Sequence, residues 1–99
     1  MSRSLRWFPE AVLDLARLRE FIHVHNPDAA ARAAKRIREA AHKLQTMSFV
    51  GRPVPDIEPP LRDLFIHFGQ AGYWLRYMVT DEEIIIVKIW HGREDRPFS

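Results

Sequence analysis

Residues 61–95 read LRDLFIHFGQAGYWLRYMVTDEEIIIVKIWHGRED, and this stretch predicts the centre of the fold. Runs rich in β-branched and aromatic residues alternate here with short polar turns, which is typical of successive antiparallel strands. The predicted strands are Leu61–Phe68, Tyr73–Thr80 and Ile84–Trp90. The last of them is apolar on both faces except at Lys88, a pattern that indicates a central strand or one covered on both sides.

Two helices are predicted before this sheet. The first runs from Pro9 to about His25, and acidic side chains at Glu10 and Asp14 suit its N-terminal turns. Its apolar stripe comprises Ala11, Leu15, Leu18, Ile22 and His25, widened by Val12 and Phe21. The second helix runs from Pro27 to about Thr46, is capped by Asn26, and carries a stripe of mostly small residues. The short connection between the two predicts an antiparallel helical hairpin.

Two further segments have weaker patterns. Ser4–Phe8 alternates enough to predict a short first strand. Met47–Pro60 holds one glycine and four prolines, which indicates an extended connector between the hairpin and the sheet.

Length and composition limit the class of protein. Ninety-nine residues, 46% of them hydrophobic, predict one globular domain over residues 1–99. The net charge is +2 and the sequence pI is about 9.4, which favours an anionic or acidic partner without requiring one. There is no cysteine, and neither a secretion signal nor an apolar run of membrane-spanning length is present. We therefore expect a cytoplasmic protein without disulfides or membrane association.

Cofactor and metal signatures are missing from the sequence. His23 and His25 are two residues apart on a predicted helix, so their side chains point in different directions and no metal site is predicted. The chain has no glycine-rich phosphate loop and no serine nucleophile elbow, and we expect no cofactor.

The remaining candidates for chemistry lie in the predicted sheet and its C-terminal end. They are Arg62, Arg76, His91, Arg93 and Glu94. Arginines could hold a phosphodiester and stabilise charge in the transition state, while the histidine or the glutamate moves a proton. The same residues could instead bind an acidic surface or pair with one another. For Arg76, which lies in an apolar and aromatic strand, a structural ion pair is the alternative.

Several short motifs follow one another over nearly the full length. They are Glu10-Ala11-x-x-Asp14-Leu15, Asn26-Pro27-x-Ala29-Ala30, Ile37 with Ala40 and Leu44, Gly51-Arg52-Pro53, Leu61-Arg62-x-Leu64, Phe68-Gly69-x-x-Gly72-Tyr73, the Arg76 strand, and Ile89-x-His91-Gly92-Arg93-Glu94-Asp95. In their order and spacing the chain resembles the RelE/ParE family of bacterial type II toxin–antitoxin toxins. The resemblance implies an α+β fold in the order β-α-α-β-β-β, with a helical hairpin packed on a mostly antiparallel sheet.

The resemblance also implies a protein partner. A cognate antitoxin, ParD-like or RelB-like, would neutralise the toxin, and operator DNA would be bound only through that antitoxin. Antitoxins of this family typically wrap an amphipathic segment around the toxin, which requires exposed apolar surface. We expect such contacts at Val12, Leu13, Ala16 and Trp74, unless these side chains belong to the core.

The family has two broad activities. RelE-like members cut mRNA on the ribosome, typically with connector lysines, strand arginines and a tyrosine near the C-terminus, whereas ParE-like members poison DNA gyrase and need no nuclease site. Here Arg62 and Arg76 match the strand arginines, but the connector has Arg52 and no lysine, and no tyrosine follows Tyr77.

We therefore predict a ParE-like gyrase inhibitor. Its target-binding residues would be Arg76, His91, Arg93, Glu94 and Arg96. A RelE-like, ribosome-dependent mRNA endonuclease is the alternative, and a non-toxic remnant that only binds an antitoxin is a third possibility.

Overall fold

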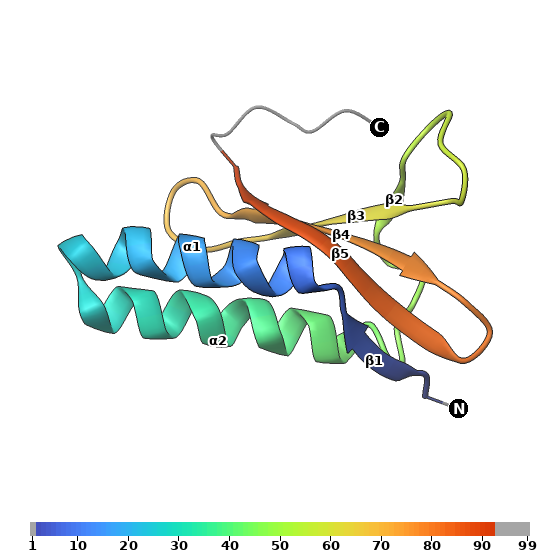
Figure 1. Ribbon diagram of the computed structural model, residues 1–99, viewed down its shortest axis with the longest axis horizontal. Helices are drawn as coiled ribbons and strands as arrows, with labels where there is room; N and C mark the ends of the chain where they lie inside the picture. The colour runs from blue at the N-terminus through green and yellow to red at the C-terminus, as the bar shows by residue number, and fades with distance from the viewer. Residues whose placement is uncertain (1, 93–99) are drawn as a thin grey trace.

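Figure 1 shows the computed structural model, which describes residues 2–92 as two helices packed against a five-stranded sheet. The elements are β1 (Ser4–Trp7), α1 (Pro9–His25), α2 (Pro27–Lys43), β2 (Arg52–Pro53), β3 (Arg62–Ile66), β4 (Tyr73–Val79) and β5 (Glu83–His91). The sheet order is β1-β5-β4-β3-β2, with β1 parallel to β5 and the other neighbours antiparallel. The predicted fold is confirmed, and the predicted connector contains the additional short strand β2.

Strand β5 lies in the middle of the sheet, between β1 and β4, as its apolar sequence predicted. Ile84, Ile86 and Ile89 are fully buried in the main core. The register between β4 and β5 shifts next to Arg76, where Val87 is the extra residue of β5. Such a bulge interrupts the alternation of faces, so that Ile86 and Ile89 both reach the core although they are three residues apart.

The helical hairpin turns at Asn26. This residue ends α1, and its side-chain Oδ1 accepts a hydrogen bond at 3.1 Å from the backbone N–H of Ala29 in the first turn of α2. Pro27 takes the first position of α2, where a missing N–H costs nothing. Helix α2 ends at Lys43, three residues before the predicted end, and Leu44 forms its C-terminal cap. The buried side of α2 is mostly alanine, as predicted, which allows close approach of α1 and the sheet.

The apolar stripe of α1 was predicted only in part. Ala11 and Leu18 are buried as expected, but Val12 is 51% exposed, Phe21 is 68% exposed, and His25 is also at the surface. The helix contacts only α2 and β5 to any large extent. These two neighbours bury a narrower part of its surface than the predicted stripe. The helical spacing of apolar residues locates the face of a helix that is buried, but it does not show how wide the buried surface is.

The connector is tied to the sheet by the buried hydroxyl of Tyr77. This hydroxyl donates a hydrogen bond to the carbonyl of Ser48 at 2.8 Å and accepts one from the N–H of Gly51 at 2.9 Å. A Cβ at Gly51 would lie 2.6 Å from the same oxygen, so a glycine is required there. Burial raises the pKa of Tyr77 above its ordinary value of 10.0, against smaller opposing effects of the Gly51 N–H and Arg62.

We expect the variant Tyr77→Phe to fold with a free energy of unfolding about 1–3 kcal/mol lower at pH 7, because the Gly51 N–H and the Ser48 carbonyl lose their partner in a buried site. Denaturant titration followed by tryptophan fluorescence measures the loss. An unchanged unfolding midpoint would contradict the role assigned to this hydroxyl.

The same variant should alter the pH dependence of stability. The folded protein holds the Tyr77 proton more tightly than the unfolded chain, so this contribution is complete below about pH 10 and declines as the pH rises through that value. Tyr77→Phe should therefore lose less stability than the wild type as the pH rises above about 10. Tyr73, whose pKa is also raised by burial, is present in both proteins and cancels in the comparison.

Candidate functional site

Arg76 forms a buried ion pair with Asp63 of the neighbouring strand. Its Nε and Nη2 atoms donate to the two carboxylate oxygens at 2.8 and 3.0 Å, and both side chains are 5% exposed. The guanidinium also lies 5.2 Å from the ring centroid of Trp90. This bidentate arrangement uses the full fork of the arginine. The structure thus agrees with the ion-pair interpretation of Arg76, and the guanidinium is not exposed to a phosphate or to a protein target.

Arg62 anchors the connector. Its Nη1 atom donates to the backbone carbonyls of Gly51 at 2.7 Å and of Phe49 at 3.2 Å. The guanidinium groups of Arg62 and Arg3 lie 5.1 and 5.3 Å from the centroid of the Phe49 ring, which is 60% exposed. Cation–π contacts of this kind hold an aromatic ring in place at the surface. Arg62 therefore positions the connector in this structure.

His91 lies at the other end of the sheet. Its ring meets Tyr73 edge-on, with the centroids 5.4 Å apart. His91 is paired across the sheet with Tyr73 and so lies level with Ile66, whereas Arg62 is level with Tyr77. Four residues of β3 separate the two levels, roughly 14 Å along the strand. The predicted catalytic residues Arg62, Arg76 and His91 are therefore not brought together, and Arg93, Glu94 and Arg96 lie outside the described residues.

Acidic side chains of α1 bind the C-terminal half of β5 through a hydrogen bond and ion pairs. The pairing of β1 with β5 ends at Ile86. Beyond that point the Asp14 carboxylate, on a residue that is 8% exposed, accepts a hydrogen bond from the N–H of Ile89 at 3.0 Å. The ammonium group of Lys88 lies 3.7 Å from the same oxygen and 3.0 Å from Glu10. The sequence predicts a helix-dipole role for Asp14, whereas the structure gives it a structural role, which its position on the buried face of α1 indicates.

The chain path just after His91 is also constrained. The N–H of Gly92 donates to the carbonyl of Gly72 at 3.0 Å. A Cβ at Gly92 would collide with the carbonyl oxygen of Ala71, so the turn that ends β5 requires a glycine.

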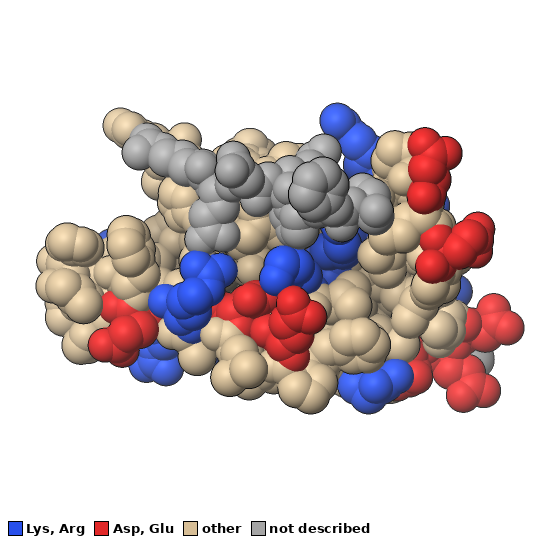
Figure 2. Space-filling model, turned by 45° about the horizontal axis from the view of Figure 1, so that its top comes forward, with Lys and Arg blue, Asp and Glu red and all other residues tan. Residues whose placement is uncertain are grey.

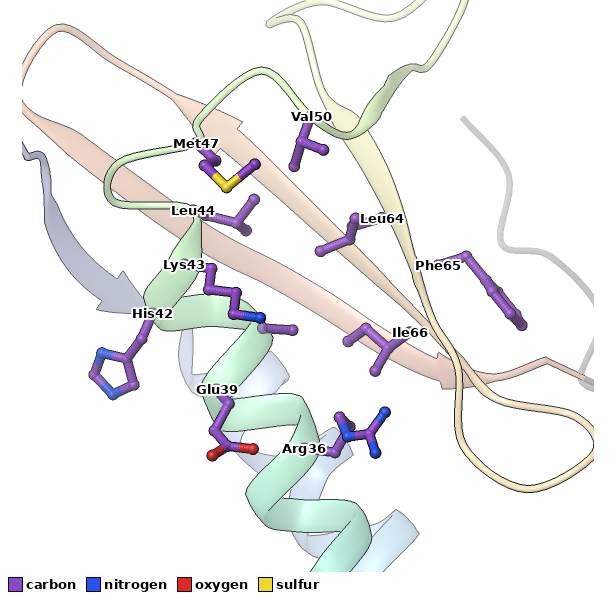
Figure 3. A pocket seen from close by; sticks show the side chains of 11 residues that line it. Arg36, Glu39, His42, Lys43, Leu44, Met47, Val50, Leu64, Phe65 and Ile66 are labelled. Carbon is purple, nitrogen blue, oxygen red and sulfur yellow. The ribbon is translucent and has the colours of Figure 1, made fainter.

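An open groove lies between α2 and β3, with a volume of about 690 Å³ (Figure 3). It is lined by Arg36, Glu39, Ala40, His42, Lys43, Leu44, Met47, Val50, Leu64, Phe65 and Ile66. Met47 and Val50 are 56% and 55% exposed, so apolar surface faces solvent here. The sequence does not predict this groove, because its lining comes from α2, the connector and β3, which meet only in the folded chain.

The four predicted antitoxin contacts fall on two surfaces. Val12, Leu13 and Ala16 are exposed on α1. Trp74 lies on the face of the sheet away from the helices, between the rings of Phe65 and Trp90, whose centroids are 5.0 and 6.3 Å away. None of these side chains belongs to the core cluster: Val12, Leu13 and Ala16 are exposed and Trp74 is half-buried. Their contact with an antitoxin stays a prediction.

Surface charge is mixed on the face seen in Figure 2, where Lys and Arg side chains lie beside Asp and Glu. Within residues 2–92 no group of three His, Asp or Glu side chains is placed to hold a metal ion. Over the same range, neither helix has both the length and the apolar character needed to cross a membrane.

We expect Arg76→Ala to lower the free energy of unfolding by about 3–5 kcal/mol, because the Asp63 carboxylate is left buried without its partner. The double variant Asp63→Leu/Arg76→Met replaces the pair by apolar side chains and should recover most of that loss. Thermal and denaturant unfolding of the wild type and both variants measure the effect. A single variant as stable as the wild type would contradict the structural role of Arg76.

Similar proteins were found by sequence and by structure. The family model described as the ParE toxin of the type II toxin–antitoxin system parDE matches residues 5–96. Toxin RelE3 of Caulobacter vibrioides is 34% identical over 94 residues, which cover 95% of this chain and 99% of that protein. Toxin RelE1 of the same organism is 34% identical over 83 residues, covering 84% and 86%. The solved structure of the chromosomal ParDE TA system from P. aeruginosa superposes with a TM-score of 0.75 at 26% identity, covering 91% of this chain and 96% of that chain.

Proposed function

The chain belongs to the RelE/ParE family of type II toxin–antitoxin toxins, and on that premise we propose that it is a ParE-like toxin that binds and inhibits DNA gyrase in the cytoplasm. The observation that favours gyrase inhibition over mRNA cleavage is that both strand arginines are hydrogen-bonded to other groups of the chain. Arg76 is buried and bound to Asp63 through two nitrogens of its guanidinium, so it cannot reach a phosphate. The Nη1 atom of Arg62 is already bound to two connector carbonyls. Inhibition by binding requires no assembled acid–base pair.

We place the gyrase contacts at the C-terminal end of the chain. The proposed residues are His91, Arg93, Glu94 and Arg96. Arg76 is left out of this set because its side chain is 5% exposed. His91 is partly exposed at the end of β5, held by the Tyr73 ring and by the turn at Gly92.

A cognate antitoxin would neutralise the toxin, with contacts to the exposed side of α1. Leu13 is 69% exposed and Val12 is 51% exposed, and Ala16 lies one turn further along the helix. Apolar side chains at this spacing suit an amphipathic segment of a partner. Binding of operator DNA would then depend on the antitoxin.

The second candidate function is ribosome-dependent cleavage of mRNA. The names of the relatives Toxin RelE3 and Toxin RelE1 favour it. A nuclease built from these residues would need a rearrangement, because Arg62 and His91 lie at opposite ends of the sheet.

We expect purified toxin to block gyrase supercoiling while leaving mRNA intact in a translating extract, when the two assays are titrated in parallel. The variant His91→Ala should raise the half-inhibitory concentration about 10-fold, which corresponds to about 1.4 kcal/mol of binding free energy. His23→Ala, at an exposed histidine of α1, is the matched control and should inhibit like the wild type.

Full supercoiling at saturating, folded toxin would overturn the gyrase proposal. Codon-positioned cuts in mRNA with normal gyrase activity would make the endonuclease the function of this chain.

A further inference from the structure

The side of α1 that faces away from the core carries large apolar side chains. Leu13 is 69% exposed, Phe21 is 68% exposed and Val24 is 73% exposed. Within residues 2–92 the helix packs mainly on α2 and β5, with Ala11 and Leu18 buried on that inner side. Large apolar side chains that lie close together at a surface indicate a site where another protein binds.

These exposed side chains belong to one continuous stripe. Because an α-helix turns by about 100° per residue, the positions spaced three, four, seven, eight and eleven residues from Leu13 lie on its side of the helix, within about 140° of the circumference. We call these positions the outer stripe, and every one of them is exposed. The outer stripe consists of Leu13, Ala16, Arg17, Glu20, Phe21 and Val24.

The outer stripe is complementary to a second copy of itself that runs in the opposite direction. A two-fold axis perpendicular to α1 at the middle of the stripe pairs residues that are equally far from that point. Leu13 of one copy then lies opposite Val24 of the other. Ala16 lies opposite Phe21, so that a small side chain leaves room for a large one. Each apolar residue of the stripe thereby meets an apolar residue of the second copy.

The two charged residues of the outer stripe fit the same arrangement. Arg17 of one copy lies opposite Glu20 of the other, and the symmetry produces this pair twice. A parallel pairing of the helices would instead place Arg17 against Arg17 and Glu20 against Glu20, where like charges repel. The charges therefore favour the antiparallel pairing over the parallel one.

We propose that, in the absence of an antitoxin, the outer stripe of α1 binds a second copy of this chain as an antiparallel helix pair. The contact is limited to one helix of 17 residues, about 25 Å long. Such a contact buries less surface than the roughly 1,200–2,000 Å² of a standard interface, so we expect a weak dimer with a dissociation constant on the order of 10–100 µM.

The pairing has a consequence for neutralisation. Leu13 and Ala16 are also among the residues at which we expect the antitoxin to bind. One surface cannot hold both partners, so the antitoxin binds the monomer and competes with self-association. The dimer itself goes beyond the proposed function and does not depend on the target of the toxin.

Charge reversals test the dimer by sedimentation equilibrium of the full chain, freed of antitoxin, between about 1 and 300 µM. Arg17→Glu and Glu20→Arg should each raise the dissociation constant of the dimer at least about 10-fold, because like charges then meet. The double variant Arg17→Glu/Glu20→Arg exchanges the two charges and should return the constant to within about 3-fold of the wild type. Arg19→Glu is the matched control, because it changes the net charge as Arg17→Glu does at an exposed position of α1 outside the stripe, and its effect should be less than about 2-fold.

The double variant separates self-pairing from binding of an unrelated partner, because only a second copy carries the compensating exchange. A chain that stays monomeric over the whole concentration range would overturn the proposal. A double variant as weak as the single ones, or a dimer that neither single reversal weakens, would overturn it too. All substituted positions are exposed, and circular dichroism checks that each variant is folded.

Disulfide cross-linking tests the register, since the chain contains no cysteine of its own. A mixture of Leu13→Cys and Val24→Cys should form, on oxidation, a covalent dimer with one copy of each variant. Leu13→Cys alone should stay uncrosslinked, because its two copies would be about 16 Å apart along the helix axis. Equal cross-linking in both samples would contradict the register. Neither measurement involves gyrase or an antitoxin, so failure here is distinct from failure of the proposed function.

Discussion

Every layer of this structure is attached to β5. One edge of this strand pairs with β1, the other edge pairs with β4, and α1 packs on its face. Burial of an isoleucine side chain contributes about 1.5–3 kcal/mol, and β5 provides Ile84, Ile86 and Ile89 to the core. Where β1 ends, the Asp14 carboxylate takes over the role of a neighbouring strand by accepting the Ile89 N–H. A side chain thereby completes a sheet edge that backbone pairing leaves open.

The strands and helices could be predicted from the sequence because their signals are local. The apolar run Ile84–Trp90 indicated the central strand, and Asn26-Pro27 indicated the hairpin turn. Other features depend on contacts between distant segments. The partner of Arg76 is Asp63, thirteen residues earlier, and nothing in either strand alone shows that the two side chains share a face and a register. The groove likewise requires α2, the connector and β3 to be in place before Met47 and Val50 acquire a common surface.

The two strand arginines show how much a motif leaves open. Arg62 and Arg76 both match the positions expected from the family resemblance, yet one binds backbone carbonyls and the other a buried carboxylate. A guanidinium group can bind a phosphate, a carboxylate or a backbone carbonyl, and the acceptors that the fold places within reach decide which of them it meets. Here the nearest acceptors belong to the chain itself.

The shape of the β3 edge also has a consequence for the colloidal behaviour of the free chain. Exposed edges promote aggregation when they are long and flat. This one is short, since β2 with Pro53 covers one end and Arg36 caps the carbonyl of His67 at the other. Two copies that met edge to edge at Phe65 would bring the cations of both α2 helices together, and like charges repel. The uncovered part of the edge is therefore too short to extend into a fibril-like stack of identical chains.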